Sequence, residues 1–228
     1  MTEKGQSRLR NSTALVTRVG GMGGPAAQML AMAGVGKLIL AHGGQLESPD
    51  LNRQVLGTEA GIGMPRAIQF AQTLERLSQF VEVEALDREP DDAEALELAQ
   101  RCDVILSCPP TFAERLRLNR ASLQARIPFI DAAQWGMTGT LFVSRPGATA
   151  CLACAYPAPP PFEEFFPVVG AISAAIGSLA ALEAIKILSG NGNPFWGRMV
   201  VYDGFHARIT DFDVSPRAEC ECRSYAPA

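Results

Sequence analysis

A short apolar strand stands directly before a glycine-rich turn and the start of a helix. The strand covers residues 13–19, the turn is Gly-Gly-Met-Gly-Gly at residues 20–24, and Pro25 stands where the first helical residue is expected. Glycines let a ligand approach the backbone closely, and the free N–H groups of a helix N-terminus attract phosphate. This order of elements predicts a nucleotide-binding turn. Its predicted contact residues are Gly20, Gly21 and Gly23.

The composition is that of a soluble globular protein. The chain has 228 residues, of which 47% are hydrophobic, and its formal net charge at pH 7 is −4. This apolar share is enough for a substantial core, and the weakly acidic balance argues against nucleic acid as a partner. Residues 1–12 are polar and carry no apolar signal segment, so we expect a cytoplasmic protein.

Apolar strands alternate with amphipathic helices through the first part of the chain. Strands are expected at residues 13–19, 37–41, 81–86, 103–106 and 127–130, and helices at residues 24–33, 63–78, 91–100 and 111–124. This alternation predicts an α/β, Rossmann-like fold in which helices cover both faces of a mainly parallel sheet.

The pattern changes in the second part of the chain. Antiparallel strands are expected at residues 139–144, 198–202 and 207–212. The proline-rich segment 157–167 is expected to be an extended crossover loop. We therefore expect one domain over residues 1–228, with a nucleotide-binding half at 1–135. The remaining half, 136–228, holds the antiparallel strands, the crossover loop and a small zinc region.

Residues 168–188 are almost continuously apolar and nearly long enough to cross a bilayer. Glu183 and Lys186 lie within this segment, and charged residues inside a membrane span are costly. Small residues such as Gly177 and Ala180 favour close helix packing in a protein core or a dimer interface. We therefore expect no membrane insertion.

Four of the six cysteines form two close pairs. Cys151 and Cys154 are separated by two residues, and Cys220 and Cys222 by one. Structural zinc takes four ligands at tetrahedral positions, and a close pair supplies two of them from one turn. This spacing predicts a structural zinc site with these four ligands. The alternative is that one pair is free or disulfide-linked. The other two cysteines are expected to be buried apolar residues.

Polar side chains near the glycine turn supply the other candidate contacts. Most dinucleotide sites have an acidic residue after the second strand that binds the ribose. Here that position is His42, which either contacts the nucleotide or is a loop residue with no ligand. Arg66 is expected in the first turn of a helix, where the dipole disfavours a cation unless an anion lies nearby. Arg53, between Asn52 and Gln54, is a further candidate for phosphate contact.

Several motifs in this chain occur together and in the same order in a known family. They lie at residues 20–24, 33–36, 50–54, 63–66, 151–154 and 182–188 and at the C-terminal cysteine pair. With these motifs the chain resembles the ThiF/MoeB/HesA family, the bacterial relatives of ubiquitin-activating enzymes. Residues 38–44 and 50–54 are similar to those of HesA-type proteins, which are associated with nitrogen-fixation gene clusters.

The resemblance implies a homodimer that binds ATP and Mg²⁺ and adenylates a carboxylate. The implied substrate is the C-terminal glycine of a small ubiquitin-like sulfur-carrier protein. By this analogy the glycine turn approaches the nucleotide, and Arg53 and Arg66 are the catalytic residues that contact phosphates. The cofactor-binding set is completed by His42, Asn52 and Gln54. The four paired cysteines would match the structural zinc site of the family.

Some positions depart from the family's pattern. Arg18 replaces the first loop glycine, His42 the acidic ribose ligand, Arg66 a lysine, Asp50 an asparagine, and Pro110 an aspartate that helps to hold magnesium. Arginine keeps the charge of lysine with a different geometry, whereas proline has no side chain to coordinate a metal. The family's arginine-bearing N-terminal arm has no match, and the crossover segment holds no cysteine for thioester or persulfide chemistry.

Two functions therefore fit the sequence. In the first, the chain is an active adenylyltransferase in which Arg18, Arg53 and Arg66 stabilise the triphosphate. In the second, it is a binding or scaffold protein that keeps the fold with little adenylation and handles a carrier, a metal or a cofactor intermediate. An NAD-dependent oxidoreductase is disfavoured by His42 and by the cysteine pairs.

Overall fold

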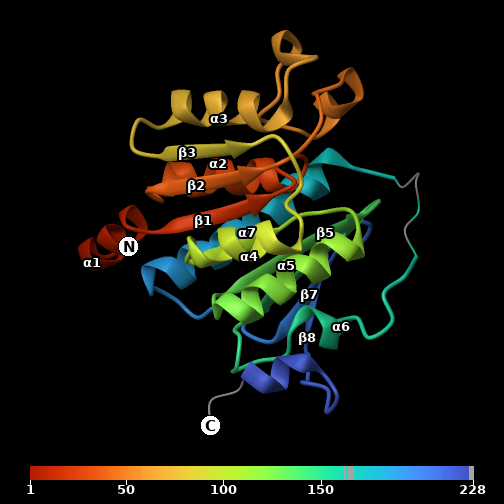
Figure 1. The fold of residues 1–228 in the computed structure, drawn as a ribbon. Helices are drawn as coiled ribbons and strands as arrows, with labels where there is room; N and C mark the ends of the chain where they lie inside the picture. The colour runs from red at the N-terminus through yellow and green to blue at the C-terminus, as the bar shows by residue number, and fades with distance from the viewer. Residues whose placement is uncertain (162, 164–166, 226–228) are drawn as a thin grey trace.

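The computed structural model describes residues 1–161, 163 and 167–225 and shows a central sheet with helices on both sides (Figure 1). The sheet has eight strands in the order β3-β2-β1-β4-β5-β6-β7-β8. The strands are β1 Thr13–Thr17, β2 Lys37–Ala41, β3 Glu82–Leu86, β4 Val104–Ser107, β5 Phe129–Trp135, β6 Thr138–Ser144, β7 Arg198–Asp203 and β8 Arg208–Asp213. The expected α/β, Rossmann-like fold is confirmed.

Strand pairing divides the sheet into two parts. Strands β1 to β5 pair in parallel, whereas β6, β7 and β8 add to the sheet as antiparallel neighbours. Thr17 at the end of β1 stands beside Ala41 of β2 and Ser107 of β4, so the carboxyl ends of these strands meet at one edge. Loops that leave this edge are therefore brought together.

The described helices comprise seven α-helices and three short 3-10 helices. They are α1 Glu3–Arg10, α2 Gly23–Ala33, α3 Arg66–Leu77, α4 Asp92–Gln100, α5 Phe112–Ala125, α6 Leu152–Ala155, α7 Gly170–Ser189, η1 Ser48–Asn52, η2 Glu59–Gly61 and η3 Glu221–Tyr225.

Each face of the sheet has its own apolar core, because successive side chains of a strand point to opposite faces. Ala14 and Val16 of β1 belong to the core formed with α2, α3 and α7. Leu15, between them, belongs to the other core, which includes residues of α4, α5 and α6. The parallel strands are therefore covered on both sides, as expected for a parallel sheet.

Helix α7 packs against α2 and the sheet. A Cβ at Gly177 would lie 2.2 Å from the carbonyl oxygen of Met22, so only glycine allows the two helices to approach this closely. Ala180, Ala181 and Ala184 are also buried. By length and composition alone α7 would suit a membrane span, but half of its most apolar window is buried inside this fold. Its small residues serve core packing.

Helix α1 and the proline-rich segment 157–167 lie outside the alternating pattern of strands and helices. Helix α1 was not predicted; it is capped by the side chain of Thr2 and buries Leu9 completely. The expected crossover loop at 157–167 has no helix in its described residues, whereas residues 162 and 164–166 lie outside the described part of the chain.

Candidate nucleotide site and cysteine cluster

A cavity of about 580 Å³ opens at the carboxyl ends of the parallel strands. It lies where the strand order reverses, between β1 and β4, which is where open α/β sheets bind ligands. Lining residues next to β1 and β2 include Gly20, Gly21, His42, Arg53, Gln54 and Arg66. Lining residues from β4 onward include Pro110, Phe112, Arg115, Trp135 and Tyr156. The predicted nucleotide contacts Gly23 and Asn52 are not among the described lining residues.

The glycine turn forms one wall of this cavity. A Cβ on Gly20 would lie 3.3 Å from Cε1 of His42, and one on Gly21 would lie 3.1 Å from Oγ of Ser173. Gly23 packs beneath the turn, where a Cβ would lie 2.7 Å from the carbonyl oxygen of Arg18. Helix α2 follows and has no side-chain cap. In its first turn the N–H of Gly24 donates to the carbonyl oxygen of Gly20 at 2.9 Å and Pro25 has no N–H, so Gly23 is the first-turn residue whose N–H can face a ligand.

Arg18 occupies the position of the family's first loop glycine and is held by two carboxylates. Its backbone φ is 52°, in the left-handed region that glycine adopts freely. Its guanidinium contacts Glu89 at 2.9 Å and Glu114 at 2.8 Å. Burial lowers the pKa of Arg18, but hydrogen bonding to Glu114 and the charges of both glutamates raise it by more. The Arg18 side chain therefore stays positively charged, and the carboxylates of Glu89 and Glu114 neutralise that charge.

His42 is buried beside the glycine turn and stays neutral. Burial lowers its pKa to about 3, and the positive charges of Arg18 and Arg66 act in the same direction. Its ring lies 6.1 Å from that of Phe70. Within the described residues, Nδ1 of His42 and Oε1 of Gln54 are buried atoms with no hydrogen-bond partner. Two polar atoms beside the turn thus remain able to bind a ligand group or water.

The lowered pKa of His42 predicts a specific loss of stability in acid. The unfolded state takes up a proton near pH 6.5, whereas the folded state does not until the pH approaches 3. Stability is therefore complete above pH 6.5 and falls as the pH is lowered towards 3. The difference in unfolding free energy between wild type and His42→Asn is expected to shrink by about 2 kcal/mol from about pH 7.5 to about pH 5. Urea unfolding of both proteins at both pH values measures this difference. A difference that is the same at the two pH values contradicts the lowered pKa of His42.

Arg53 and Arg66 meet at the buried carboxylate of Asp50. Nη2 of Arg66 lies 2.7 Å from Oδ2 of Asp50, and Nη2 of Arg53 lies 3.2 Å from Oδ1. The anion expected beside Arg66 is therefore supplied by the chain itself. Asn52 accepts a 2.9 Å hydrogen bond from Nη1 of Arg53, so its side chain orients that arginine.

A buried ion pair, of which Arg115 lines the cavity, was not predicted from the sequence. Arg115 is 3% exposed and donates from Nε to Oδ1 of Asp131 at 2.9 Å, and from Nη2 to Oδ2. Ser107 also donates to Asp131, and the guanidinium lies 4.1 Å from the ring centroid of Phe112. Burial opposes the charge on Arg115, but Asp131 raises its pKa by more. The pair is fixed and lends the cavity no free charge.

Breaking this pair from one side is expected to destabilise the fold. Asp131→Asn leaves the buried Arg115 without its counter-charge and should lower the unfolding free energy by about 3–5 kcal/mol. Arg88→Ala, which removes an exposed partner of Glu94, is the matched control and should leave stability unchanged within error. Denaturant titrations compare the unfolding free energies of wild type and the two variants. Equal values for Asp131→Asn and wild type contradict the role of Asp131 as the counter-charge of Arg115.

The cavity offers little support for a resident magnesium ion. Pro110 lines it, and by the resemblance described above this is the position at which an aspartate is expected. The carboxylates among the described lining residues are those of Asp50, which already binds two arginines, and Glu163. Mg²⁺ is commonly held by one or two carboxylates together with substrate phosphates. The described lining residues do not form such a site on their own, so Mg²⁺ would need ligand phosphates to be held here.

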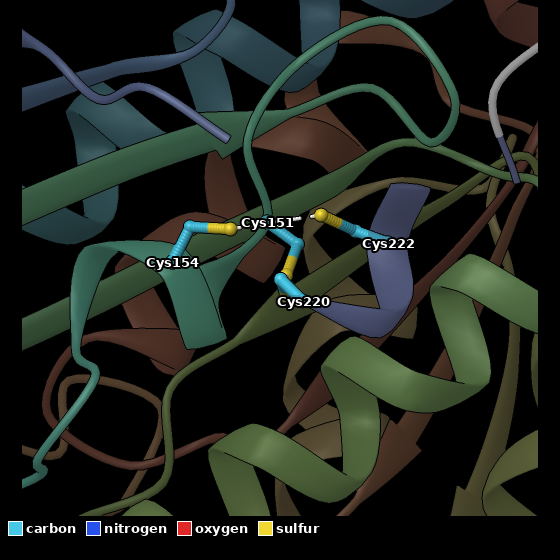
Figure 2. A group of neighbouring side chains, drawn as sticks. All are labelled: Cys151, Cys154, Cys220 and Cys222. Carbon is cyan, nitrogen blue, oxygen red and sulfur yellow. Dashed lines mark hydrogen bonds between the residues drawn. The ribbon is translucent and has the colours of Figure 1, made fainter. Parts of the chain in front are cut away.

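The four paired cysteines come from two segments that are far apart in the sequence, and their side chains meet in one cluster (Figure 2). Cys151 and Cys154 come from the start of α6, and Cys220 and Cys222 from the C-terminal segment around η3. Their sulfur atoms all lie within 4.8 Å of one another, with 3.5 Å between Cys151 and Cys220 and 3.6 Å between Cys154 and Cys222. All four side chains are buried, so this cluster ties the C-terminal segment to α6.

These distances fit a tetrahedral metal. Zinc–sulfur bonds of about 2.3 Å place tetrahedral sulfurs about 3.8 Å apart. Burial raises the pKa of Cys154, but hydrogen bonds, including one from the backbone N–H of Arg217, lower it to about 7. Burial also raises the pKa of Cys151, to about 11. The expected gathering of four cysteines is found, and the donor set can hold a metal ion.

Comparisons with known proteins agree with this architecture. The model of the ThiF family matches residues 1–224. The chain is 46% identical over 195 residues to Protein HesA of Leptolyngbya boryana, an alignment that covers 84% of this chain and 70% of that protein. It is 36% identical over 230 residues to Adenylyltransferase and sulfurtransferase MOCS3 of Drosophila ananassae, covering 98% of this chain and 51% of that protein. The chain thus spans about half of that longer relative.

Solved structures show the same fold. Escherichia coli MccB with ATP superposes with a TM-score of 0.86 at 19% identity, covering 96% of this chain and 68% of that one. The microcin C7 biosynthetic enzyme MccB with N-formylated MccA gives a TM-score of 0.88 at 19% identity, covering 96% and 70%.

Proposed function

The chain belongs to the ThiF family, and we propose that it is an ATP-dependent adenylyltransferase that activates a carboxylate. The proposed substrate is the C-terminus of a small ubiquitin-like sulfur-carrier protein, and the proposed setting is cytoplasmic assembly of a nitrogenase or molybdenum cofactor. The observation that carries the proposal is the cavity that is lined by the glycine turn, by Met22 at the N-cap of α2 and by two arginines.

In the proposed reaction, an oxygen of the substrate carboxylate attacks the α-phosphorus of ATP. The bond from that phosphorus to the bridging oxygen breaks, pyrophosphate leaves, and an acyl-adenylate forms. The backbone N–H group of Gly21, with the guanidinium groups of Arg53 and Arg66, stabilises the negative charge on the phosphates. Neutral His42, whose buried Nδ1 has no hydrogen-bond partner among the described residues, accepts a hydrogen bond from a ribose hydroxyl.

The acyl substrate is proposed to enter from the side of β5 and β6. Phe112 and Tyr156 pack edge to face there, with ring centroids 4.9 Å apart. Trp135, Thr138 and Thr140 line the same cavity. Aromatic walls with hydroxyl groups suit an extended, uncharged peptide tail better than a compact charged molecule.

The second candidate function is a scaffold that binds a carrier or a cofactor intermediate with little adenylation. It is favoured because the arginines that line the cavity are already paired with carboxylates of the chain. Arg18 pairs with Glu89 and Glu114. Arg53 and Arg66, the candidate phosphate contacts, both pair with Asp50. Pro110 also removes a side chain that the family uses.

Isotope exchange between ATP and pyrophosphate distinguishes these functions. The protein is incubated with a panel of small carrier proteins that end in Gly-Gly, each paired with a C-terminally amidated control that has no free carboxylate. Exchange that depends on the free carboxylate is the expected result. Absence of exchange with every carrier, together with absence of ATP binding, removes the adenylyltransferase and leaves the scaffold.

A structural metal and a dimer complete the proposal. Cys151, Cys154, Cys220 and Cys222 would hold Zn²⁺ with no open ligand position, so the ion stabilises the fold and takes no part in the reaction. The active form is proposed to be a homodimer, which sedimentation analysis of the purified protein measures.

A further inference from the structure

The carboxylate of Asp50 occupies the place between the two arginines that line the candidate phosphate site. It is 5% exposed and lines the same cavity. Oδ2 accepts from Nε of Arg66 at 3.1 Å and from Nη2 at 2.7 Å, while Oδ1 accepts from Nη2 of Arg53 at 3.2 Å. One internal anion thus engages both cations.

Nη1 of each arginine is also bonded within the chain. Nη1 of Arg66 donates to the carbonyl oxygen of Gly43 at 3.2 Å. Nη1 of Arg53 donates to the carbonyl oxygen of Pro49 and to Oδ1 of Asn52. A phosphate that binds here must therefore replace or share the bonds to Asp50, and its negative charge must approach that of the carboxylate.

We propose that Asp50 is a built-in competitor that lowers the affinity of the arginine pair for polyphosphate. The inference deepens the proposed function and rests on it for the identity of the ligand, a nucleoside triphosphate. Replacing the carboxylate by the isosteric amide removes the charge, frees Arg53 from an ion pair and leaves Arg66 a neutral acceptor. Asp50 is in this sense a specificity-determining residue, because only an anion that binds the two arginines strongly enough can displace its carboxylate.

Asparagine is the suitable test because Asp50 also has a local structural role. Its Oδ2 accepts from the backbone N–H of Glu47 at 3.0 Å and closes the turn of η1. An asparagine oxygen can accept the same bond, so the turn is retained. Asp50→Ser is the second variant, because a serine hydroxyl also accepts from a turn N–H and carries no charge.

The experiment measures binding of inorganic tripolyphosphate and of Mg–ATP by titration calorimetry at low ionic strength, for wild type, Asp50→Asn and Asp50→Ser. Asp92→Asn removes one acidic charge from the exposed start of α4 and is the matched control. Tripolyphosphate is expected to bind Asp50→Asn at least about tenfold more tightly than wild type, with Asp92→Asn unchanged, because removing a nearby like charge favours the anion. Thermal unfolding verifies that each variant is folded.

The two probes separate failure of this inference from failure of the proposed function. Tighter tripolyphosphate binding by the variants, with no ATP binding by wild type or by either variant, supports the role of Asp50 and removes the nucleotide site. Unchanged or weaker binding of both probes by folded Asp50→Asn and Asp50→Ser overturns the inference, even if wild type catalyses exchange. If wild type binds Mg–ATP, the variants do not, and tripolyphosphate binding is unchanged, the inference is also overturned, because Asp50 would then be helping to hold Mg²⁺.

Discussion

Cys154→Ser is expected to abolish zinc binding and to lower the free energy of unfolding by at least about 4 kcal/mol, because a structural zinc site contributes its binding energy to folding. The four sulfurs lie within 4.8 Å of one another and join α6 to the C-terminal segment. Without the ion, buried thiols remain and that connection is lost. Metal analysis of the purified protein, with denaturant unfolding before and after chelation, measures both effects.

The control is Cys102→Ala, which changes a buried cysteine at the start of β4 that is not part of the cluster. It should retain one zinc ion per chain and unfold close to wild type. Freshly purified wild type that contains no zinc, and whose stability does not respond to a chelator, contradicts the assignment.

Arg66→Ala is expected to reduce carrier-dependent ATP–pyrophosphate exchange by about 10²–10³-fold, since removal of one preorganised charge from a transition state commonly has this effect. Arg66 stands in the first turn of α3 and lines the cavity. Arg66→Lys keeps the charge found at this position in the family and should retain much more activity than the alanine variant.

Two controls separate this effect from loss of structure. Arg88→Ala removes an exposed arginine that does not line the described cavity and should leave exchange unchanged. Thermal unfolding of Arg66→Ala reports whether loss of the bond to Asp50 disturbs the fold. Exchange by folded Arg66→Ala within about twofold of wild type excludes a phosphate contact for this residue.

The regular elements of the nucleotide half could be predicted because they depend on local patterns. Alternating strands and helices, Pro25 at the start of α2 and Gly34 at its end all carry local signals, and the structure has α2 at Gly23–Ala33. Strand β5 extends five residues beyond its predicted end, to Trp135, because it pairs with β6 along its full length. The two strands form a hairpin connected by residues 136–137, and the apolar pattern of the sequence did not indicate that turn.

The partners of charged residues were the least predictable feature. The sequence indicated that Arg66 needed an anion, but not that Asp50, sixteen positions earlier, supplies it. Arg115 and Asp131 were not identified, because their pairing depends on how α5 packs on β5. Helix α1 was missed because its composition is polar and Leu9 alone carries most of its apolar contact. The cysteine cluster was predictable, since close pairs of thiols have few other structural roles in such a chain.

Calorimetric titration of the 228-residue protein with Mg–ATP decides whether the turn after β1 is a nucleotide site. Wild type is expected to bind with a dissociation constant in the range of about 1 μM to 1 mM, typical of enzyme substrates. Gly21→Glu should abolish binding, because a side chain there meets Ser173 and adds negative charge beside the turn. Wild type that shows no binding at millimolar ATP, or folded Gly21→Glu that binds as well as wild type, contradicts the nucleotide site.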